Sequence, residues 1–369
     1  MTYTKAKGGG RIPDDSGKEL IASNQKRMAM ASSVLSAISS ILPHPWEADR
    51  MDRIAFILGN TYIYWNSIVL TLAAGAAICI FLAFYLPEGQ GSAAAVAVPM
   101  TLVLSIFFGR LLHWYFRPDS YGGFLKAITD YTSGGYALLG CFAACGLTAG
   151  ILKLLRLEKE PLRLLDAMSL GGCAGIAVGR LACFFSSADR GQLLQSLRTL
   201  PFAYPVNNVV TGAPEYRLAT FVIQAMATAV IFGGLAAFTL LARRRRGDVT
   251  LLFLLLYGLS QAVLDSTRYD SLYLRSNGFV SVAQLLSAAA LVAVSVIFAV
   301  RMGKTRGFRW WYVPLWLFML ALLGGAGYME YYVQRHGDKA LFSYANMTVC
   351  LGTFTALSLL TYRASIKST

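Results

Sequence analysis

The chain has 369 residues and a formal net charge of +14, with 56% hydrophobic and only 14% charged residues. Because soluble domains carry roughly a quarter charged residues, this composition excludes an ordinary water-soluble protein. A soluble protein this basic would suggest a nucleic-acid partner, but the cations here fall in short connections between long apolar runs. We therefore expect a membrane protein that binds no nucleic acid.

Two polar or weakly apolar segments precede the first long apolar run. Residues 1–27 are rich in Gly, Lys and Asp without a helical apolar period, which is typical of a disordered tail. Residues 28–56 are expected to form an interfacial helix, at 28–43, and a linker. A short extra crossing at 28–43 is the alternative, and it would place the tail on the inside.

Nine apolar stretches then follow along the chain. About 30 Å of hydrocarbon requires roughly 20 apolar residues in a helix, because every backbone polar group must be satisfied within the segment. We predict an all-α, polytopic integral membrane protein with about seven core transmembrane helices at 57–303 and a C-terminal two-helix hairpin at 304–369. The predicted spans are 62–86, 91–116, 133–155, 164–186, 218–242, 249–266, 278–300, 311–331 and 342–362. The longest connection, 187–217, contains Pro, Gly and Asn, which indicate turns rather than a helix.

Three clusters of lysine and arginine fix the expected topology. They lie at 153–163, 243–246 and 301–309, each in a short connection between spans. Cytoplasmic loops carry such an excess of cations. The first span therefore starts outside, and the C-terminus lies inside.

The six cysteines all fall within the predicted spans. Buried cysteine usually behaves as a small hydrophobic residue. Cys141 and Cys145 are one helical turn apart, but no histidine or carboxylate lies near enough in sequence to complete a metal site. We expect no metal, no cofactor and no disulfide framework.

A few ionisable residues lie inside the predicted spans, where an unpaired charge costs at least a few kcal/mol. They are Arg110, His113, Arg180, Asp265 and Arg268. Three arginines that converge from different helices are expected to bind an anion, and the abundant anion in a membrane is a phospholipid head group. The alternative is that each arginine reaches the interface or pairs locally, as Asp265 and Arg268 can at a spacing of three.

Glycines crowd the fourth span, SLGGCAGIAVG. Small residues at this spacing let helix backbones approach closely. We expect a tight helix contact there.

Six short motifs occur in an order that resembles one known family, the prolipoprotein diacylglyceryl transferases of the bacterial inner membrane. The strongest is LGGCAGIAVGRLACFF followed by ADRG, which resembles the family's signature and places Arg180 on its arginine. The others are LGNTYIYW, FFGRLLHWYF, TDYTSGGYALLG, LYGLSQAVLDSTRYD and GFVSVAQLLS. Together the motifs extend over roughly residues 57 to 300.

The resemblance implies an activity and a set of site residues. Such enzymes move a diacylglyceryl group from phosphatidylglycerol to a cysteine thiol of a lipoprotein precursor, so phosphatidylglycerol and a lipoprotein signal peptide are the expected partners. The motifs place four residues at the lipid head group: Arg110, Arg180, Asp265 and Arg268.

Four positions depart from the family's pattern. Leu139 occupies the place of the histidine in Ser-Phe-His-Gly-Gly, and Cys183 replaces the signature asparagine. Asn66 and Gln224 stand where the family has an aromatic residue and a glutamate. The change at Leu139 bears most on catalysis because it removes the usual proton acceptor.

The implied reaction sets two tasks: neutralise the departing phosphate and remove the thiol proton. Arg180 and Arg268, with Arg110, are the candidates for the first task. His113 is the candidate for the second, because it is the one histidine within the family-like core. Asp189 and Asp265 are weaker alternatives, since an unperturbed carboxylate is a poor base for a thiol.

Three functions remain open from the sequence. A transferase with the family's lipid donor, and either a lipoprotein precursor or a variant acceptor, is the first. A non-catalytic phospholipid-binding relative is the second, and a lipid transporter is the third. For transfer to a standard lipoprotein peptide we expect a slow or absent reaction that rises with pH as the thiolate fraction rises.

Overall fold

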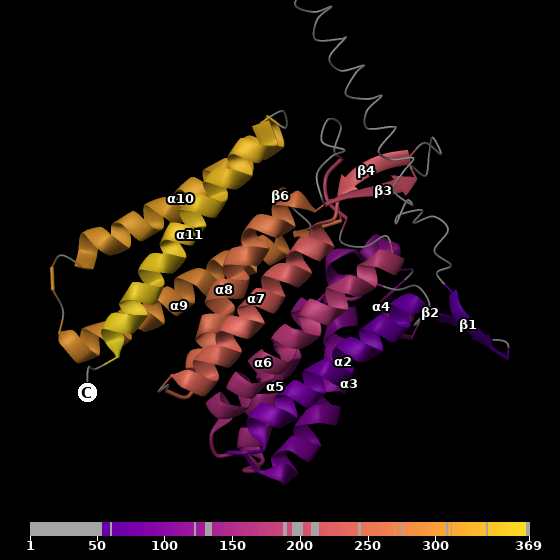
Figure 1. The fold of residues 1–369 in the computed structure, drawn as a ribbon, viewed down its shortest axis with the longest axis horizontal. Helices are drawn as coiled ribbons and strands as arrows, with labels where there is room; N and C mark the ends of the chain where they lie inside the picture. The colour runs from indigo at the N-terminus through magenta and orange to yellow at the C-terminus, as the bar shows by residue number, and fades with distance from the viewer. Residues whose placement is uncertain are drawn as a thin grey trace, which may run out of the picture. The chain divides into compact units, whose positions relative to one another are not determined.

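Long apolar helices account for most of the chain in the computed structural model (Figure 1), and they follow the order of the nine predicted spans. Their bounds are α2 Trp65–Tyr85, α3 Gly91–Phe116, α5 Leu139–Leu154, α6 Pro161–Gly179, α7 Thr220–Leu241, α8 Asp248–Leu264, α9 Val282–Arg306, α10 Tyr312–Arg335 and α11 Ala340–Ser365. Among the described residues, eight helices are long and apolar enough to cross a membrane, and α5, with 16 residues, is shorter. The all-α, polytopic class is thus confirmed, with seven core helices and a C-terminal pair.

The structure describes residues 54–366 except for short gaps. These gaps are 60, 122, 130–134, 187–189, 194–201, 208–213, 243–244, 269, 275–276, 308, 311 and 337–338. The predicted tail at 1–27 and the interfacial helix at 28–43 lie outside the described residues, as does Asp189.

Short elements precede or connect the long helices. The helical ones are α4 Phe124–Thr129 and the 3-10 turns η1 Pro118–Ser120, η2 Arg180–Phe185 and η3 Asp265–Thr267. Three antiparallel hairpins pair β1 Ile54–Leu58 with β2 Thr61–Tyr64, β3 Ala203–Asn207 with β4 Pro214–Leu218, and β5 Tyr273–Leu274 with β6 Asn277–Ser281. The β3–β4 hairpin lies in the connection that the sequence predicted to be turns.

The predicted start of the seventh span, residue 278, is wrong. Residues 277–281 form β6, and α9 begins at Val282. A capping box explains the change of structure, because the Ser281 side chain accepts from the Gln284 backbone N–H while the Gln284 side chain accepts from the Ser281 N–H. The helix therefore starts four residues later than its apolar run.

Glycines bring two pairs of helices into close contact, and the spacing in the fourth span predicted the contact made by α6. A Cβ on Gly171 of α6 would lie 2.5 Å from the carbonyl oxygen of Ala77 in α2. A Cβ on Gly140 of α5 would overlap the backbone of Gly109 in α3. Any larger residue at Gly140 would push α3 and α5 apart.

The three basic clusters meet at one end of the helices, which we call the basic end. Arg163 donates to the carbonyl oxygen of Glu88, Arg246 pairs with Glu160, and Arg301 Nη1 lies 2.6 Å from Asp248 Oδ1. These contacts join the loops that the charge pattern assigned to the cytoplasm. The same charge pattern predicts that the opposite ends of the helices lie at the outer face, and we call them the outer end.

The C-terminal pair packs on the core through α11. Figure 1 shows α10 and α11 side by side next to α9, at the flank away from α2 and α3. Three side-chain bonds tie α11 to the core along its length: Tyr344 to the Ser266 carbonyl at 3.4 Å, Ser358 to Ser295 at 2.6 Å, and Tyr362 to Asp248 at 2.8 Å. The pair is therefore a fixed part of this fold.

Candidate functional site

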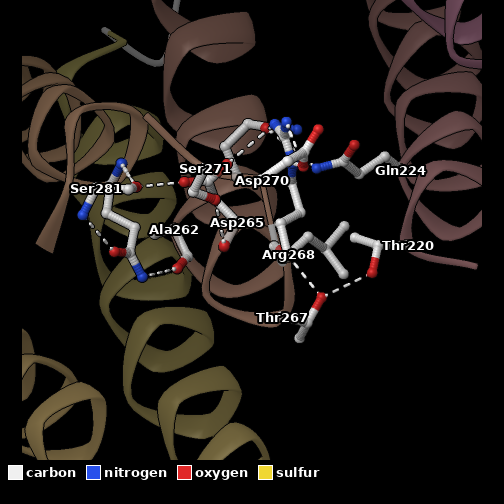
Figure 2. Close-up of polar contacts among 12 residues, drawn as sticks. Thr220, Gln224, Ala262, Asp265, Thr267, Arg268, Asp270, Ser271 and Ser281 are labelled. Carbon is white, nitrogen blue, oxygen red and sulfur yellow. Dashed lines mark hydrogen bonds and ion pairs between the residues drawn. The ribbon is translucent and has the colours of Figure 1, made fainter. Parts of the chain in front are cut away.

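Asp265 and Arg268 form the centre of the polar cluster at the outer end of α8 (Figure 2). Arg268 Nη1 donates to Asp265 Oδ1 at 3.2 Å, which confirms the predicted pairing at a spacing of three. Its Nε and Nη2 atoms donate to Asp270 Oδ1 at 3.2 and 3.1 Å. Two carboxylates therefore fix the orientation of this guanidinium.

Asp265 itself is held from two further directions. Its second carboxylate oxygen accepts from the Ser281 hydroxyl, and its carbonyl oxygen accepts from Ser271 Oγ at 3.0 Å (Figure 2). Only 2% of Asp265 is exposed. Several donors hold this buried carboxylate in place, so it can orient Arg268.

The ADRG motif supplies a backbone support for Arg268. Gly191 pairs with Arg268 as an isolated antiparallel bridge, and its N–H donates to the carbonyl oxygen of Leu218 at 2.7 Å. A Cβ on Gly191 would lie 2.5 Å from Thr220 Oγ1. Thr220 in turn bonds Thr267 at 3.0 Å. A larger residue would therefore not fit at Gly191, which lies next to the candidate head-group residue Arg268.

Arg180 begins η2, immediately after α6 ends at the outer end. Aromatic contacts hold η2 in place: Phe184 meets Phe221 edge to face at 4.8 Å, and Tyr204 donates to the Phe184 carbonyl at 3.2 Å. Because α6 packs against α8, Arg180 and Arg268 follow neighbouring helices at the same end. That both contact one phosphate remains a prediction.

Arg110 and His113 are joined through Tyr121, which follows η1. Arg110 is 2% exposed, and its Nη1 donates to the Tyr121 hydroxyl at 2.9 Å and to the Gly135 carbonyl at 3.0 Å. The same hydroxyl lies 2.9 Å from His113 Nδ1. The Arg110 guanidinium also sits over the Tyr121 and Tyr136 rings, 5.0 and 5.1 Å from their centroids.

His113 lies on α3 near the point where this helix crosses the start of α5. Leu139 is the first residue of α5, and the next residue, Gly140, touches Gly109 of α3. His113 follows Gly109 by about one helical turn on α3. The imidazole and Leu139 therefore belong to facing helices near one crossing point.

Arg117 connects the two clusters. Its Nη2 donates to the carbonyl oxygens of Asp270 at 2.9 Å and Ser271 at 3.2 Å. The end of α3, with Arg110 and His113, is thereby tied to the loop that carries Arg268. The predicted site residues thus form two linked groups.

Tyr273 adds a hydroxyl beside this loop. Burial raises the pKa of the Tyr273 phenol, and the Asp265 and Glu330 carboxylates act in the same direction, whereas Arg268 and Arg117 oppose them. The phenol therefore stays protonated at neutral pH and offers a donor.

Gln224, at the place of the family's glutamate, lies inside the helix bundle and is fully buried. Its Nε2 donates to Gln261 Oε1 at 3.4 Å. The neutral amide pair fills a position that an isolated carboxylate would occupy at high cost. Within the described ranges, no group of three or more His, Cys, Asp or Glu could hold a metal ion.

Sequence reasoning missed several residues of the site. These are Arg117, Tyr121, Gly135, Asp270 and Ser281. The Ser-x-x-Gln pattern before an apolar run marks a capping box and could have identified Ser281. Asp270 lies two residues after Arg268 and could have been found from that spacing. Arg117, Tyr121 and Gly135 meet their partners through folding, without a local motif.

Fold and site together define a polytopic membrane protein with arginines and acids gathered at one end of its helices. A family model for prolipoprotein diacylglyceryl transferase matches residues 53–300. The chain belongs to this family of transferases, and it is a multi-pass protein of the bacterial inner membrane.

Curated relatives agree with the family match. A phosphatidylglycerol–prolipoprotein diacylglyceryl transferase of Finegoldia magna is 27% identical over 256 residues, 69% of this chain and 97% of the relative. Proteins of the same name from Clostridium botulinum strain Langeland and Lactococcus lactis subsp. lactis are 27% identical over 255 residues and 26% over 261. These two matches cover 67% and 69% of this chain, and 96% of each relative.

Proposed function

We propose that this protein transfers a diacylglyceryl group from phosphatidylglycerol to the cysteine thiol of a lipoprotein precursor. The observation that carries the proposal is Arg268, held between Asp265 and Asp270 at the outer end. A fixed guanidinium can bind two phosphate oxygens at once. The reaction belongs to the core at 57–303, with the hairpin at 304–369 packed beside it.

The arginines act on the phosphate. Arg180, Arg268 and Arg110 bind the lipid head group, and Asp265 orients Arg268. As sulfur forms its bond to the glycerol carbon, the bond from that carbon to the phosphate oxygen breaks, and glycerol phosphate leaves with the electron pair. Fixed cations stabilise the charge that develops on the leaving oxygen.

His113 acts on the thiol. A free cysteine has a pKa of about 8.5, so only a few per cent is thiolate at pH 7. The imidazole accepts the thiol proton as sulfur attacks, and it later passes the proton to the released phosphate or to water. Such general base catalysis contributes about 100- to 10,000-fold to a rate.

A peptide assay tests the proposal. The purified chain in detergent is incubated with phosphatidylglycerol and a synthetic lipoprotein signal peptide, and the peptide is weighed by mass spectrometry. We expect the mass of one diacylglyceryl group to be added, with release of one equivalent of glycerol phosphate. The Cys-to-Ser peptide should gain nothing.

Two other outcomes identify the competing functions. Tight binding of phosphatidylglycerol with no peptide product, at any pH up to 9, indicates a non-catalytic lipid-binding protein. Movement of labelled phosphatidylglycerol between leaflets of proteoliposomes, again without product, indicates a transporter. Either result contradicts the proposed transfer.

A further inference from the structure

The hydroxyl of Tyr121 occupies a position that controls the chemistry of His113. Tyr121 is 9% exposed, and its ring meets the imidazole edge to face with centroids 5.7 Å apart. Its hydroxyl lies 2.9 Å from His113 Nδ1, 2.9 Å from Arg110 Nη1 and 3.4 Å from the Gly135 carbonyl oxygen. One phenol thus contacts a cation, an imidazole and a carbonyl.

Gly135 closes this side of the imidazole. Its φ is +81°, a conformation that favours glycine, and a Cβ there would lie 2.6 Å from His113 Cε1 and 2.9 Å from Nδ1. The Nδ1–Cε1 edge of the ring is therefore covered by Gly135 and Tyr121. Nε2 is the nitrogen that remains for a substrate.

The neutral imidazole has one N–H and one acceptor nitrogen, so its two tautomers have opposite chemistry. When Nδ1 carries the hydrogen, Nε2 has a lone pair and can take a proton from a thiol. When the phenol donates to Nδ1 instead, Nε2 carries the hydrogen and cannot act as a base. The direction of the hydrogen bond between Tyr121 and His113 therefore decides whether His113 can catalyse.

We propose that Tyr121 is a positioning residue that holds His113 in the tautomer with its hydrogen on Nδ1. The phenol hydrogen is directed to the Gly135 carbonyl, and the phenol oxygen accepts from both Arg110 Nη1 and His113 Nδ1. A carbonyl oxygen has two lone pairs, so Gly135 receives Arg110 and the phenol together. This arrangement leaves Nε2 as the acceptor for the thiol proton.

The arrangement also explains how the chain can lack the family histidine. Leu139 stands beside the crossing of Gly140 with Gly109, and His113 lies one turn further along α3. Arg110, Tyr121 and Gly135 then hold the His113 imidazole in the orientation and tautomer that a base on α3 requires. This inference rests on the proposed transfer, but the state of the ring can be measured without any reaction.

Nitrogen-15 NMR of histidine-labelled protein in lipid nanodiscs measures the tautomer directly. The His113 signals are assigned by their loss in His113→Ala, which separates them from His44 and His336. At a pH where the ring is neutral, we expect the hydrogen on Nδ1 in the parent protein. In Tyr121→Phe we expect a shift toward the Nε2–H form, which free histidine prefers. A parent ring with its hydrogen on Nε2 overturns the inference.

Kinetics provide the second test. Tyr121→Phe should lower kcat by about tenfold or more while the KM for phosphatidylglycerol changes less than about threefold, since Arg110 keeps its bond to the Gly135 carbonyl whereas His113 loses its positioning partner. Tyr136→Phe is the matched comparison. It also removes a hydroxyl from a ring over Arg110, at nearly the same distance, and it should lose far less.

A double-mutant cycle separates positioning from a general structural role. Because Tyr121 acts through His113, Tyr121→Phe should cost nothing further on a His113→Ala background. Additive losses, or a KM that rises as much as kcat falls, overturn the inference. A parent that shows no transfer at all contradicts the proposed function, and the NMR result then decides the tautomer by itself.

Discussion

Buried charged side chains have different partners at the two ends of the helices. At the basic end, carboxylates are saturated by loop backbone and by arginine: Asp166 accepts from the Gly247 and Thr250 N–H groups and from the Thr250 hydroxyl, and Asp248 accepts from Arg301 and Tyr362. Asp166 and Asp248 are 5% and 1% exposed. These acids close loops. Their work is structural.

At the outer end, acids serve the arginines instead. Asp265 and Asp270 hold Arg268, and Tyr121 bridges Arg110 to His113. These neighbours orient the guanidinium groups of Arg268 and Arg110, and they do not close a loop. The comparison teaches that burial and pairing alone do not mark a site. What distinguishes the outer end is that Arg268 and Arg110 are each oriented there, by two carboxylates in one case and by a phenol and a carbonyl in the other, and that Arg117 ties the two groups together.

The largest expected effect is loss of activity at the outer-end arginines. Arg180→Ala and Arg268→Ala should each lower the transfer rate about 100- to 1,000-fold, because each removes a cation from the departing phosphate. Lysine at either position should recover little, since an ammonium cannot make the two-oxygen contact. Peptide mass spectrometry measures the rates.

Arg335→Ala at the exposed end of α10 is the control for these variants. It removes the same charge from an exposed position at the end of α10, and it should retain its rate within about twofold. Lysine variants as active as the parent would contradict a bidentate contact.

Loss of stability should follow at the basic end. Asp248→Ala leaves Arg301, Tyr362 and the Arg245 N–H without their shared acceptor. We expect a decrease in the free energy of unfolding of about 2 to 3 kcal/mol. Thermal unfolding in detergent measures it. The fraction of Asp248→Ala protein that remains folded should transfer at the parent's rate. A lower kcat for this folded fraction would contradict a purely structural role for the basic end.

A smaller effect is expected from Asp265→Asn. The amide keeps the shape and one acceptor but loses the charge that orients Arg268, and it weakens the bond from Ser281. We expect a rate lower by about 10- to 30-fold, or about 1.4 to 2 kcal/mol of transition-state stabilisation. Equal loss of kcat in Ser281→Ala would show that the carboxylate acts by holding β6 and not by orienting Arg268.

The smallest effect tests the position of the base. Leu139→His restores the family's residue on α5, but in the proposed mechanism His113 provides a base on α3. We therefore expect a gain of less than about tenfold in the transfer rate. A gain of about 100-fold or more, the size of a full general base contribution, would show that the parent lacks a competent base.

The sequence predicted the helices well and the site only in part. Apolar runs of membrane length are a strong local signal, so nine helices were found near their observed positions. The error at residue 278 arose because hydropathy does not register a strand followed by a capping box. The pairing of Asp265 with Arg268 was predictable because both residues lie within one turn.

The contacts of Tyr121, Arg117 and Gly135 were not predictable in this way. Arg117 meets a loop more than 150 positions away, and Gly135 approaches His113 from another segment. Such contacts follow from how α3 and α5 cross and from where α8 ends. The spacing of residues in a motif predicts only contacts between residues that are close in sequence, so it could not predict these contacts.

The central claim is that the proton acceptor has moved from α5 to His113 on α3, and the pH dependence of transfer tests it most directly. Transfer by the parent and by His113→Ala is compared between pH 6 and pH 9. We predict that His113→Ala is slower by about 100-fold at pH 7. The gap should narrow at pH 9, where a thiol with a pKa of about 8.5 ionises without help. Equal rates for the two proteins at pH 7 would contradict the claim.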